Sequence, residues 1–139
     1  MNDSDASLNA VSARLLSALV NLDLEQTMRC LSADAVIEAG GSILARGTQQ
    51  ARRLLVHVFA SLNAVSYRPA AVWSNRGVSV IETDVIAEWD TGAVLLLPLT
   101  IVLRVERDLV VGLHLSCYEP ELPARIAISM RPAAACVNR

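Results

Sequence analysis

The sequence predicts an α+β fold, in which helices come first and an antiparallel sheet follows. Apolar residues recur mostly every three or four positions in the first half of the chain and every second position from residue 66 onward, which marks a change from helical to strand periodicity. Strand-like runs cover residues 66–73, 78–90, 93–106 and 109–118, separated by SNRG, TG and RD. Such short turns join antiparallel neighbours, so we expect helices packed on one face of a meander.

The first half of the chain predicts helices around one short strand. The stretch SLNAVSARLLSALVNLDLEQTMRCLS has a helical apolar stripe and forms one helix, or two that break near Asn21, with Asp23 capping the second. DAVIEAGG is a short strand that two glycines end. The next helix has Thr48 as its N-cap and Phe59 on its buried stripe.

Length and composition indicate one domain with an excess of apolar surface. Of 139 residues, 53% are hydrophobic and only 19% are charged, and a subunit interface or a small-molecule cavity would cover that excess. We expect a single domain over residues 1–121. Residues 122–139 contain prolines and no clear period, which predicts a short strand, an arm or a partly disordered tail.

Charge and cysteine content exclude several classes of partner. The net charge is -2, and no basic stripe is interleaved with aromatic residues, so we expect no nucleic acid partner. Three cysteines without a CxxC spacing predict neither a disulfide framework nor a zinc site and favour the cytoplasm. The acidic N-terminus argues against a signal peptide, and the longest apolar run, residues 93–103, is about half a membrane span.

The alternation of the strands sorts their side chains onto two faces. Three-residue loops at 91–93 and 107–109 would place Asp84 opposite Thr100 and Ser116, and Glu82 opposite Val102 and His114. The mixed face then carries Val80, Glu82, Asp84, Ile86, Leu96, Pro98, Thr100, Val102, His114, Ser116 and Tyr118. The apolar face carries Ile81, Val85, Trp89, Leu95, Leu97, Leu99, Ile101, Leu103, Leu113, Leu115 and Cys117.

Two arrangements of these faces stay open on the pattern alone. The apolar face can pack on the helices while the mixed face meets water, which is the simpler interpretation. Alternatively, both faces are buried, since the mixed face also carries aliphatic residues such as Val80, Ile86 and Leu96.

The stretch DVIAEWDTGAVLLLPLTIVLRVERDLVVGLHLSCYEP resembles the SnoaL-like group of the nuclear transport factor 2-like (NTF2-like) superfamily. It has an acid-valine pair, a Thr-Gly turn, a Leu-Pro pair, an Arg-Asp hairpin and a last strand that ends in aromatic, acid and proline. Together with LSADAVIEAGG upstream, the resemblance covers about residues 10–121. It implies a cone-shaped curved sheet that N-terminal helices close over an apolar pocket. It further implies that the mixed face lines this pocket and that the apolar face, with Leu95, Leu97, Leu113 and Leu115, forms a homodimer.

The resemblance carries over only part of the known catalytic motifs. Asp84 matches the first aspartate of limonene epoxide hydrolase, but Glu82 stands in place of its arginine and Ser116 in place of its second aspartate. Ile37 and Ala39 replace the tyrosine and asparagine that hold its water. Ala39 also stands where steroid isomerases have their catalytic aspartate, and Ser116 where SnoaL-type cyclases have theirs.

Acid–base chemistry is the reaction type that these residues predict. Glu82 and Asp84 are two apart on a strand, so their Cα atoms lie about 7 Å apart on one face, and a pocket could hold one protonated and the other ionised. We predict Asp84, Glu82, His114 and Tyr118 as catalytic, without metal or cofactor. The predicted substrate-binding residues are Thr100, Ser116, Val80, Ile86, Leu96, Pro98, Val102 and Phe59.

Three functions follow as hypotheses. The first is a cofactor-independent cyclase, isomerase or epoxide-opening enzyme acting on an apolar molecule such as a polyketide or terpenoid intermediate. The second is a dimeric small-molecule-binding module of the same fold without catalysis, which the replaced motif residues favour. The third is a structural dimeric scaffold.

Overall fold

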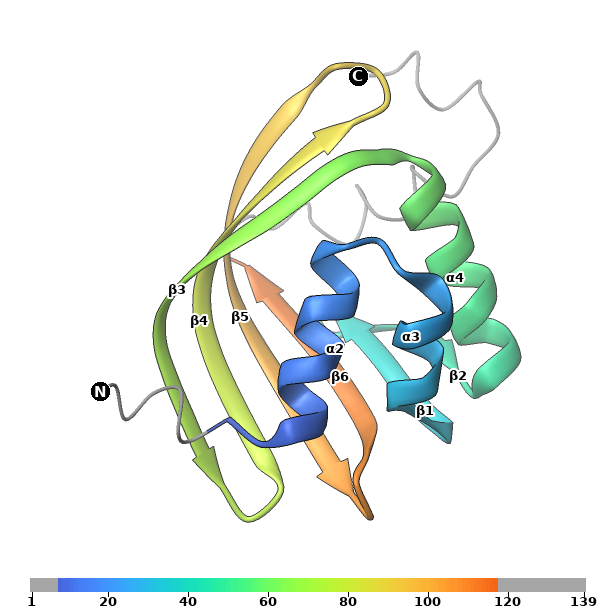
Figure 1. The fold of residues 1–139 in the computed structure, drawn as a ribbon, viewed down its shortest axis with the longest axis vertical. Coiled ribbons are helices and arrows are strands. Elements are labelled where there is room, and N and C mark those ends of the chain that lie inside the picture. The colour runs from blue at the N-terminus through green and yellow to red at the C-terminus, as the bar shows by residue number, and fades with distance from the viewer. Residues whose placement is uncertain (1–7, 118–139) are drawn as a thin grey trace.

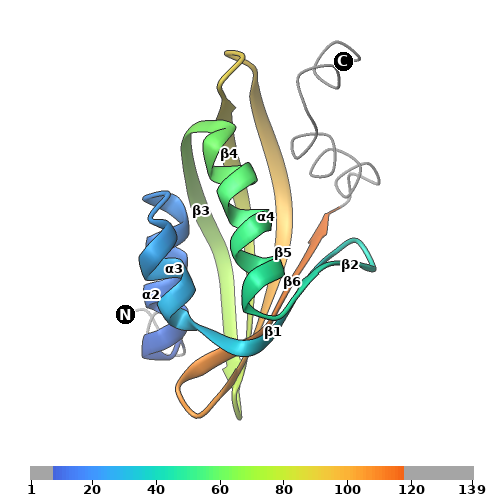
Figure 2. The same ribbon diagram turned by 90° about the vertical axis from the view of Figure 1, so that its right-hand side faces the viewer.

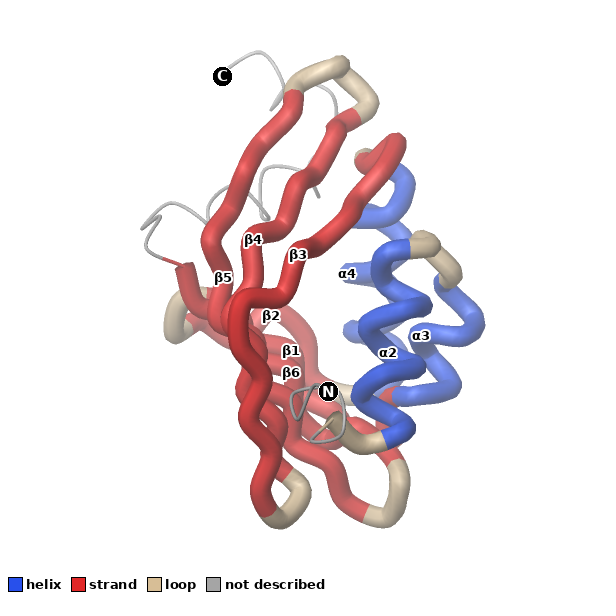
Figure 3. Tube along the Cα trace, turned by 60° about the vertical axis from the view of Figure 1, so that its left-hand side comes forward, coloured by secondary structure: helices blue, strands red, loops and turns tan. Residues whose placement is uncertain are grey.

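The chain folds into two layers, a curved sheet and a layer of helices that covers one of its faces (Figure 1). The computed structural model describes residues 8–117. The sheet curves around the helices without closing into a barrel (Figure 3). The helices are α2 (Ala10–Val20), α3 (Leu24–Cys30) and α4 (Thr48–Ala60), and the strands are β1 (Leu31–Ala39), β2 (Ser42–Arg46), β3 (Leu62–Asn75), β4 (Val78–Trp89), β5 (Val94–Glu106) and β6 (Leu109–Cys117).

The six strands form one sheet in the order β2-β1-β6-β5-β4-β3. Strands β3 to β6 make the antiparallel meander that the sequence predicts. Strand β1 lies parallel to β6, and β2 pairs antiparallel with β1 at the edge. In Figure 2 the helices stand on one side of this sheet, which confirms the α+β class. The predicted tail, residues 122–139, lies outside the described residues.

The N-terminal helical stretch is two helices, and side-chain caps define where each begins. The Asn9 side chain accepts a hydrogen bond from the Ser12 amide at 2.9 Å, and the Asp23 side chain accepts one from the Gln26 amide at 3.1 Å. Such caps satisfy amides that lack a partner in the first turn. The predicted break near Asn21 and the predicted cap at Asp23 are therefore confirmed.

The third helix begins one residue earlier than predicted. Its N-cap is Gly47, whose φ of 87° suits glycine, and Thr48 is its first helical residue. The Thr48 hydroxyl donates to the carbonyl of Ala33 at 3.3 Å. The prediction of Thr48 as the cap is wrong, because its hydroxyl bonds to β1 instead of an amide of its own helix.

Aliphatic side chains from both layers form one core. Leu15 of α2, Leu54 of α4, Ile81 of β4 and Leu103 of β5 are buried within it. Each such side chain contributes about 1.5–3 kcal/mol when it leaves water. The helices therefore cover the face of the sheet that carries Ile81 and Leu103.

The β4–β5 hairpin has a different register from the predicted one. Its loop is residues 90–92 and ends at Gly92, which has a φ of 92° and donates to the carbonyl of Trp89 at 2.9 Å. Three-residue loops place their left-handed residue last, whereas the prediction placed the glycine in the middle. Asp84 consequently pairs with Pro98 instead of Thr100.

The β5–β6 hairpin keeps its predicted register by a different route. Its loop is the two-residue turn Arg107–Asp108, both with positive φ, as in the turns that suit hairpin twist. An irregularity after Arg104 then shifts the pairing by one residue. The predicted loop 107–109 is wrong, but Thr100 opposite Ser116 and Val102 opposite His114 are confirmed.

The two faces of the sheet are separated as predicted, but their positions in the molecule are reversed. The apolar face, which we now term the inner face, meets the helices, and Leu97, Leu99 and Leu113 on it are buried. Helices with apolar stripes cannot cover carboxylates without burying unpaired charge, which is why the mixed face lies outside. The residues wrongly predicted to line the pocket are on this outer face: Val80, Glu82, Asp84, Ile86, Leu96, Pro98, Thr100, Val102, His114 and Ser116.

Candidate functional site

An apolar cavity of about 210 Å³ lies between the helices and the inner face of the sheet. Helices α2 and α4 supply one side of its wall, and all six strands contribute to the other. The wall consists of Leu16, Leu19, Val20, Ile37, Leu44, Leu54, Leu55, Val58, Phe59, Leu62, Val65, Tyr67, Val85, Ala87, Trp89, Leu95, Leu97, Leu99, Ile101, Leu113 and Leu115.

The wall of this inner cavity carries no charged residue. Among its residues only Tyr67 and Trp89 have a polar side-chain atom, and the surface that faces the cavity is carbon. Tyr67 lies on the edge strand β3 and Trp89 at the end of β4, and both are partly exposed. Side chains of this kind commonly direct their ring inward and their polar atom to water. The cavity therefore offers contact and exclusion of water, without an acid or a base.

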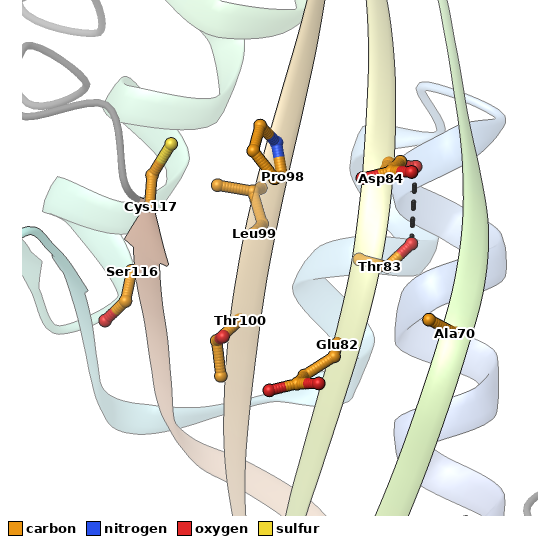
Figure 4. A pocket seen from close by; sticks show the side chains of 9 residues that line it. All are labelled: Ala70, Glu82, Thr83, Asp84, Pro98, Leu99, Thr100, Ser116 and Cys117. Atoms are coloured by element: carbon orange, nitrogen blue, oxygen red, sulfur yellow. Dashed lines mark hydrogen bonds between the residues drawn. The ribbon is translucent and has the colours of Figure 1, made fainter.

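The predicted catalytic acids lie on the opposite side of the sheet, at a shallow outer groove. Figure 4 shows Glu82, Thr100 and Ser116 on neighbouring strands, and they form one row of the strand register. The groove has a volume of about 280 Å³ and is lined by Ala70, Glu82, Thr83, Asp84, Pro98, Leu99, Thr100, Ser116 and Cys117. The acids and hydroxyls that the sequence predicts to be neighbours are thus brought together, but outside the cone.

Asp84 has an exposed side chain. The prediction of Asp84 as a catalytic residue rested on a pocket that encloses it together with Glu82. Because the groove is open to water, this reason no longer applies.

His114 pairs with a different acid from the predicted one. The carboxylate of Glu38 on β1 accepts a hydrogen bond from His114 Nδ1 at 2.7 Å, and both side chains are about one-third exposed. Glu82 lies in the next row of the register, beside Thr100. The predicted position of His114 beside Glu82 is wrong, because the β4–β5 register differs from the predicted one by two residues. Glu38 was missed because β1 was not expected to lie next to β6.

Two further predicted residues have a different outcome. Phe59 lies on the wall of the inner cavity, on the side of α4 that its apolar stripe predicts. Tyr118 lies outside the described residues. The cavity residues that the site prediction missed are those of the apolar face, including Leu97 and Leu113, which were assigned to a dimer contact. Their unbroken apolar alternation was the signal that could have found them.

Two negative findings apply to residues 8–117. No group of three or more histidine, cysteine, aspartate or glutamate side chains is placed to hold a metal ion. No helix in this part of the chain is long and apolar enough to cross a membrane.

Comparison with solved structures identifies the fold. No protein-family model and no curated protein matches the sequence. An LEH-like epoxide hydrolase from Mycobacterium tuberculosis has a TM-score of 0.72 at 14% identity, covering 98% of each chain. An NTF2-like protein of unknown function from Burkholderia pseudomallei has a TM-score of 0.70 at 15% identity, covering 91% of this chain and 98% of that one.

A candidate polyketide cyclase from a Silicibacter species gives a similar result. Its TM-score is 0.67 at 16% identity, with 87% of this chain and 93% of that one covered. At such identities the likeness concerns the backbone alone, and one fold hosts many functions. The protein described here therefore has the NTF2-like α+β fold, with a curved sheet that surrounds an apolar cavity.

Proposed function

We propose that the protein binds an apolar small molecule in the inner cavity and does not act on it chemically there. The observation that carries this proposal is a wall made only of carbon surface on a fold whose interior is hollow. The resemblance matches Ile37 and Ala39 to the residues that hold the water in limonene epoxide hydrolase, and here both are apolar and buried on the inner face. Asp84, Glu82 and Ser116, which the resemblance matches to the other catalytic positions, lie on the outer face. A ligand gains about 25 cal/mol for each Å² of apolar surface that it buries.

Filling the cavity tests the proposal. Ala87 is on the wall and is 5% exposed, so Ala87→Phe introduces a ring into the hollow. We expect this variant to bind the neutral fluorescent probe N-phenyl-1-naphthylamine at least tenfold more weakly than the wild type. Ile86→Phe is the matched control, because it adds a ring at the neighbouring position on the outer face.

The outcome separates specific from nonspecific binding. Circular dichroism and the melting temperature establish that both variants fold, because added volume can strain a core. Equal probe binding by the wild type and Ala87→Phe, with both folded, contradicts the proposal.

We further propose that a second copy of the chain covers the outer face. Val94 and Leu96 on this face are 62% and 63% exposed, and Trp73, which pairs with Val80 farther along the sheet, is 53% exposed. Large exposed apolar side chains of this kind typify interaction surfaces. The proposed homodimer therefore uses the outer face. The leucines predicted to form its contact line the cavity instead: Leu95, Leu97, Leu113 and Leu115. We place the protein in the cytoplasm, on the three cysteines in the sequence.

Acid–base catalysis remains a second candidate, now at the outer groove. The row of Glu82, Thr100 and Ser116, with Asp84 beside it, favours this candidate because it combines carboxylates and hydroxyls in one depression. It requires no cofactor and would act on a small apolar molecule by cyclisation, isomerisation or epoxide opening. Asp84→Asn would then lower turnover by about 10²-fold or more and leave probe binding in the inner cavity unchanged. A dimer on the outer face would close the groove, so the two proposals for this face exclude each other.

A further inference from the structure

The inner cavity has a composition that restricts its ligand more narrowly than apolarity alone. Ile37, Val85, Leu97 and Leu113 come from four different strands, and Leu55 faces them from α4. None of these side chains can donate or accept a hydrogen bond. A ligand atom that lies between them exchanges contact with water for contact with hydrocarbon only.

The polar groups near the cavity do not supply the hydrogen bonds that its aliphatic wall lacks. Tyr67 and Trp89 turn ring carbon to the cavity. Glu38, Glu82 and His114 lie on the outer face, separated from the cavity by the sheet. A polar or charged ligand group inside the cavity would therefore remain without a partner within residues 8–117.

We propose, resting on the binding function above, that the cavity selects an unfunctionalised hydrocarbon skeleton and discriminates against oxygen-bearing analogues of the same shape. Burying a hydroxyl without a hydrogen bond weakens binding by about tenfold or more, and burying a carboxylate weakens it further. The volume of about 210 Å³ is below the 300–1,000 Å³ that is usual for drug-sized ligands. At about 30 Å³ for each water molecule this volume equals about seven waters, which is roughly the volume of a two-ring hydrocarbon with ten carbon atoms.

A matched series of ligands tests this inference. Naphthalene, 1-naphthol and 1-naphthoate share one ten-carbon skeleton and differ by a hydroxyl or a carboxylate. Each would compete for the full-length protein at pH 8 with N-phenyl-1-naphthylamine, whose naphthyl ring has the same ten-carbon skeleton and is the part of the probe that the cavity holds. We expect naphthalene to bind at least tenfold more tightly than 1-naphthol, and 1-naphthoate to bind more weakly than both.

A variant with one polar group on the wall provides the second arm. Leu115 lies on the wall and is partly exposed, so Leu115→Asn places an amide there at a tolerable cost in packing. We expect the preference for naphthalene over 1-naphthol to fall at least threefold in this variant. The matched control Val78→Asn adds the same group on the outer face of β4, where the native side chain is 38% exposed and lines neither the cavity nor the groove, and it should keep the wild-type preference.

The outcomes distinguish this inference from the proposed function. Equal or tighter binding of 1-naphthol by the wild type overturns the hydrocarbon selectivity, and so does an unchanged preference in folded Leu115→Asn. Binding of the fluorescent probe without competition from any of the three compounds overturns the selectivity and leaves the binding function in place. Failure of the wild type to bind the probe at all overturns the proposed function and this inference with it.

Discussion

The side chain of Ser12 shows how a single buried group can reduce stability. Ser12 is 0% exposed on the inward face of α2, and its hydroxyl has no hydrogen-bond partner among the described residues. A buried hydroxyl without a partner costs about 1–3 kcal/mol. Ser12 is not among the residues of the cavity wall, so this cost has no role in the cavity.

We therefore expect Ser12→Ala to raise the free energy of unfolding by about 1 kcal/mol. Urea denaturation followed by circular dichroism measures the change. Ser17→Ala on the exposed face of the same helix is the control, because it also gains the helix propensity of alanine but relieves no buried hydroxyl. A smaller gain for Ser12→Ala than for Ser17→Ala contradicts the argument.

At the scale of elements, one ion pair links α3 to α4. Arg52 donates two hydrogen bonds to the carboxylate of Glu25, at 2.7 and 3.1 Å. The side-chain hydrogen bond from Arg52, together with the charge of its guanidinium, lowers the pKa of Glu25 below its ordinary value of 4.5. The hydrogen bond to Glu25 and the charge of its carboxylate in turn raise the pKa of Arg52. Since both side chains are exposed, water and salt screen the pair, and its contribution to stability is small.

The direction of the shift gives the pH dependence. A carboxyl whose pKa is lowered by folding stabilises the folded state above its unfolded pKa, and that contribution is lost as the pH falls through the folded pKa. We expect Glu25→Gln to melt at a slightly lower temperature than the wild type at pH 7, with a smaller difference at pH 3 and in 1 M salt.

Differential scanning calorimetry at the two pH values makes this measurement. Glu106→Gln is the control, because Glu106 is exposed at the end of β5 and its side chain forms no ion pair within residues 8–117. A destabilisation by Glu25→Gln that is larger at pH 3 than at pH 7 contradicts the assignment.

Elements were the scale at which sequence-based prediction succeeded best. The change of period placed the meander, and Asp23 marked the start of α3 because a cap is a local interaction. The β4–β5 register failed by two residues, since it depends on which loop position takes the left-handed conformation of Gly92. A shift of two residues in strand register leaves every side chain on its own face of the sheet. The prediction that Asp84 and Leu97 lie on opposite faces is therefore still correct.

At the scale of the whole molecule, the pattern could not show which side of the sheet is concave. The alternation itself favoured helices on the apolar face, and that arrangement was right. The resemblance led instead to acids inside the pocket, because positions carried over from other proteins do not say which way this chain's side chains point. The pairing of Glu38 with His114 was also out of reach, since 76 residues separate them and no local signal specifies a parallel contact at that distance.

The exposed apolar residues of the outer face lead to a prediction about assembly. Leu96 is 63% exposed on β5, so we expect Leu96→Arg to convert a wild-type dimer into a monomer without loss of the fold. Light scattering coupled to size-exclusion chromatography measures the mass. Val56→Arg on α4, where the native side chain is 44% exposed, is the control and should leave the dimer intact. A wild-type mass of one chain, or a dimer of Leu96→Arg, contradicts the proposal.

The parallel contact between β1 and β6 joins a strand that is synthesised early to one that is synthesised late. β1 is complete at residue 39, but its neighbour on one side begins only at Leu109. During synthesis, the apolar stripes of α2 and α4 leave the ribosome long before the last strand of the surface that they cover. At the usual rate of about 5–20 residues per second, the nascent chain spends several seconds with leucines exposed that later line the cavity. Within residues 8–117, the surface that these leucines cover is therefore complete only when β6 has left the ribosome.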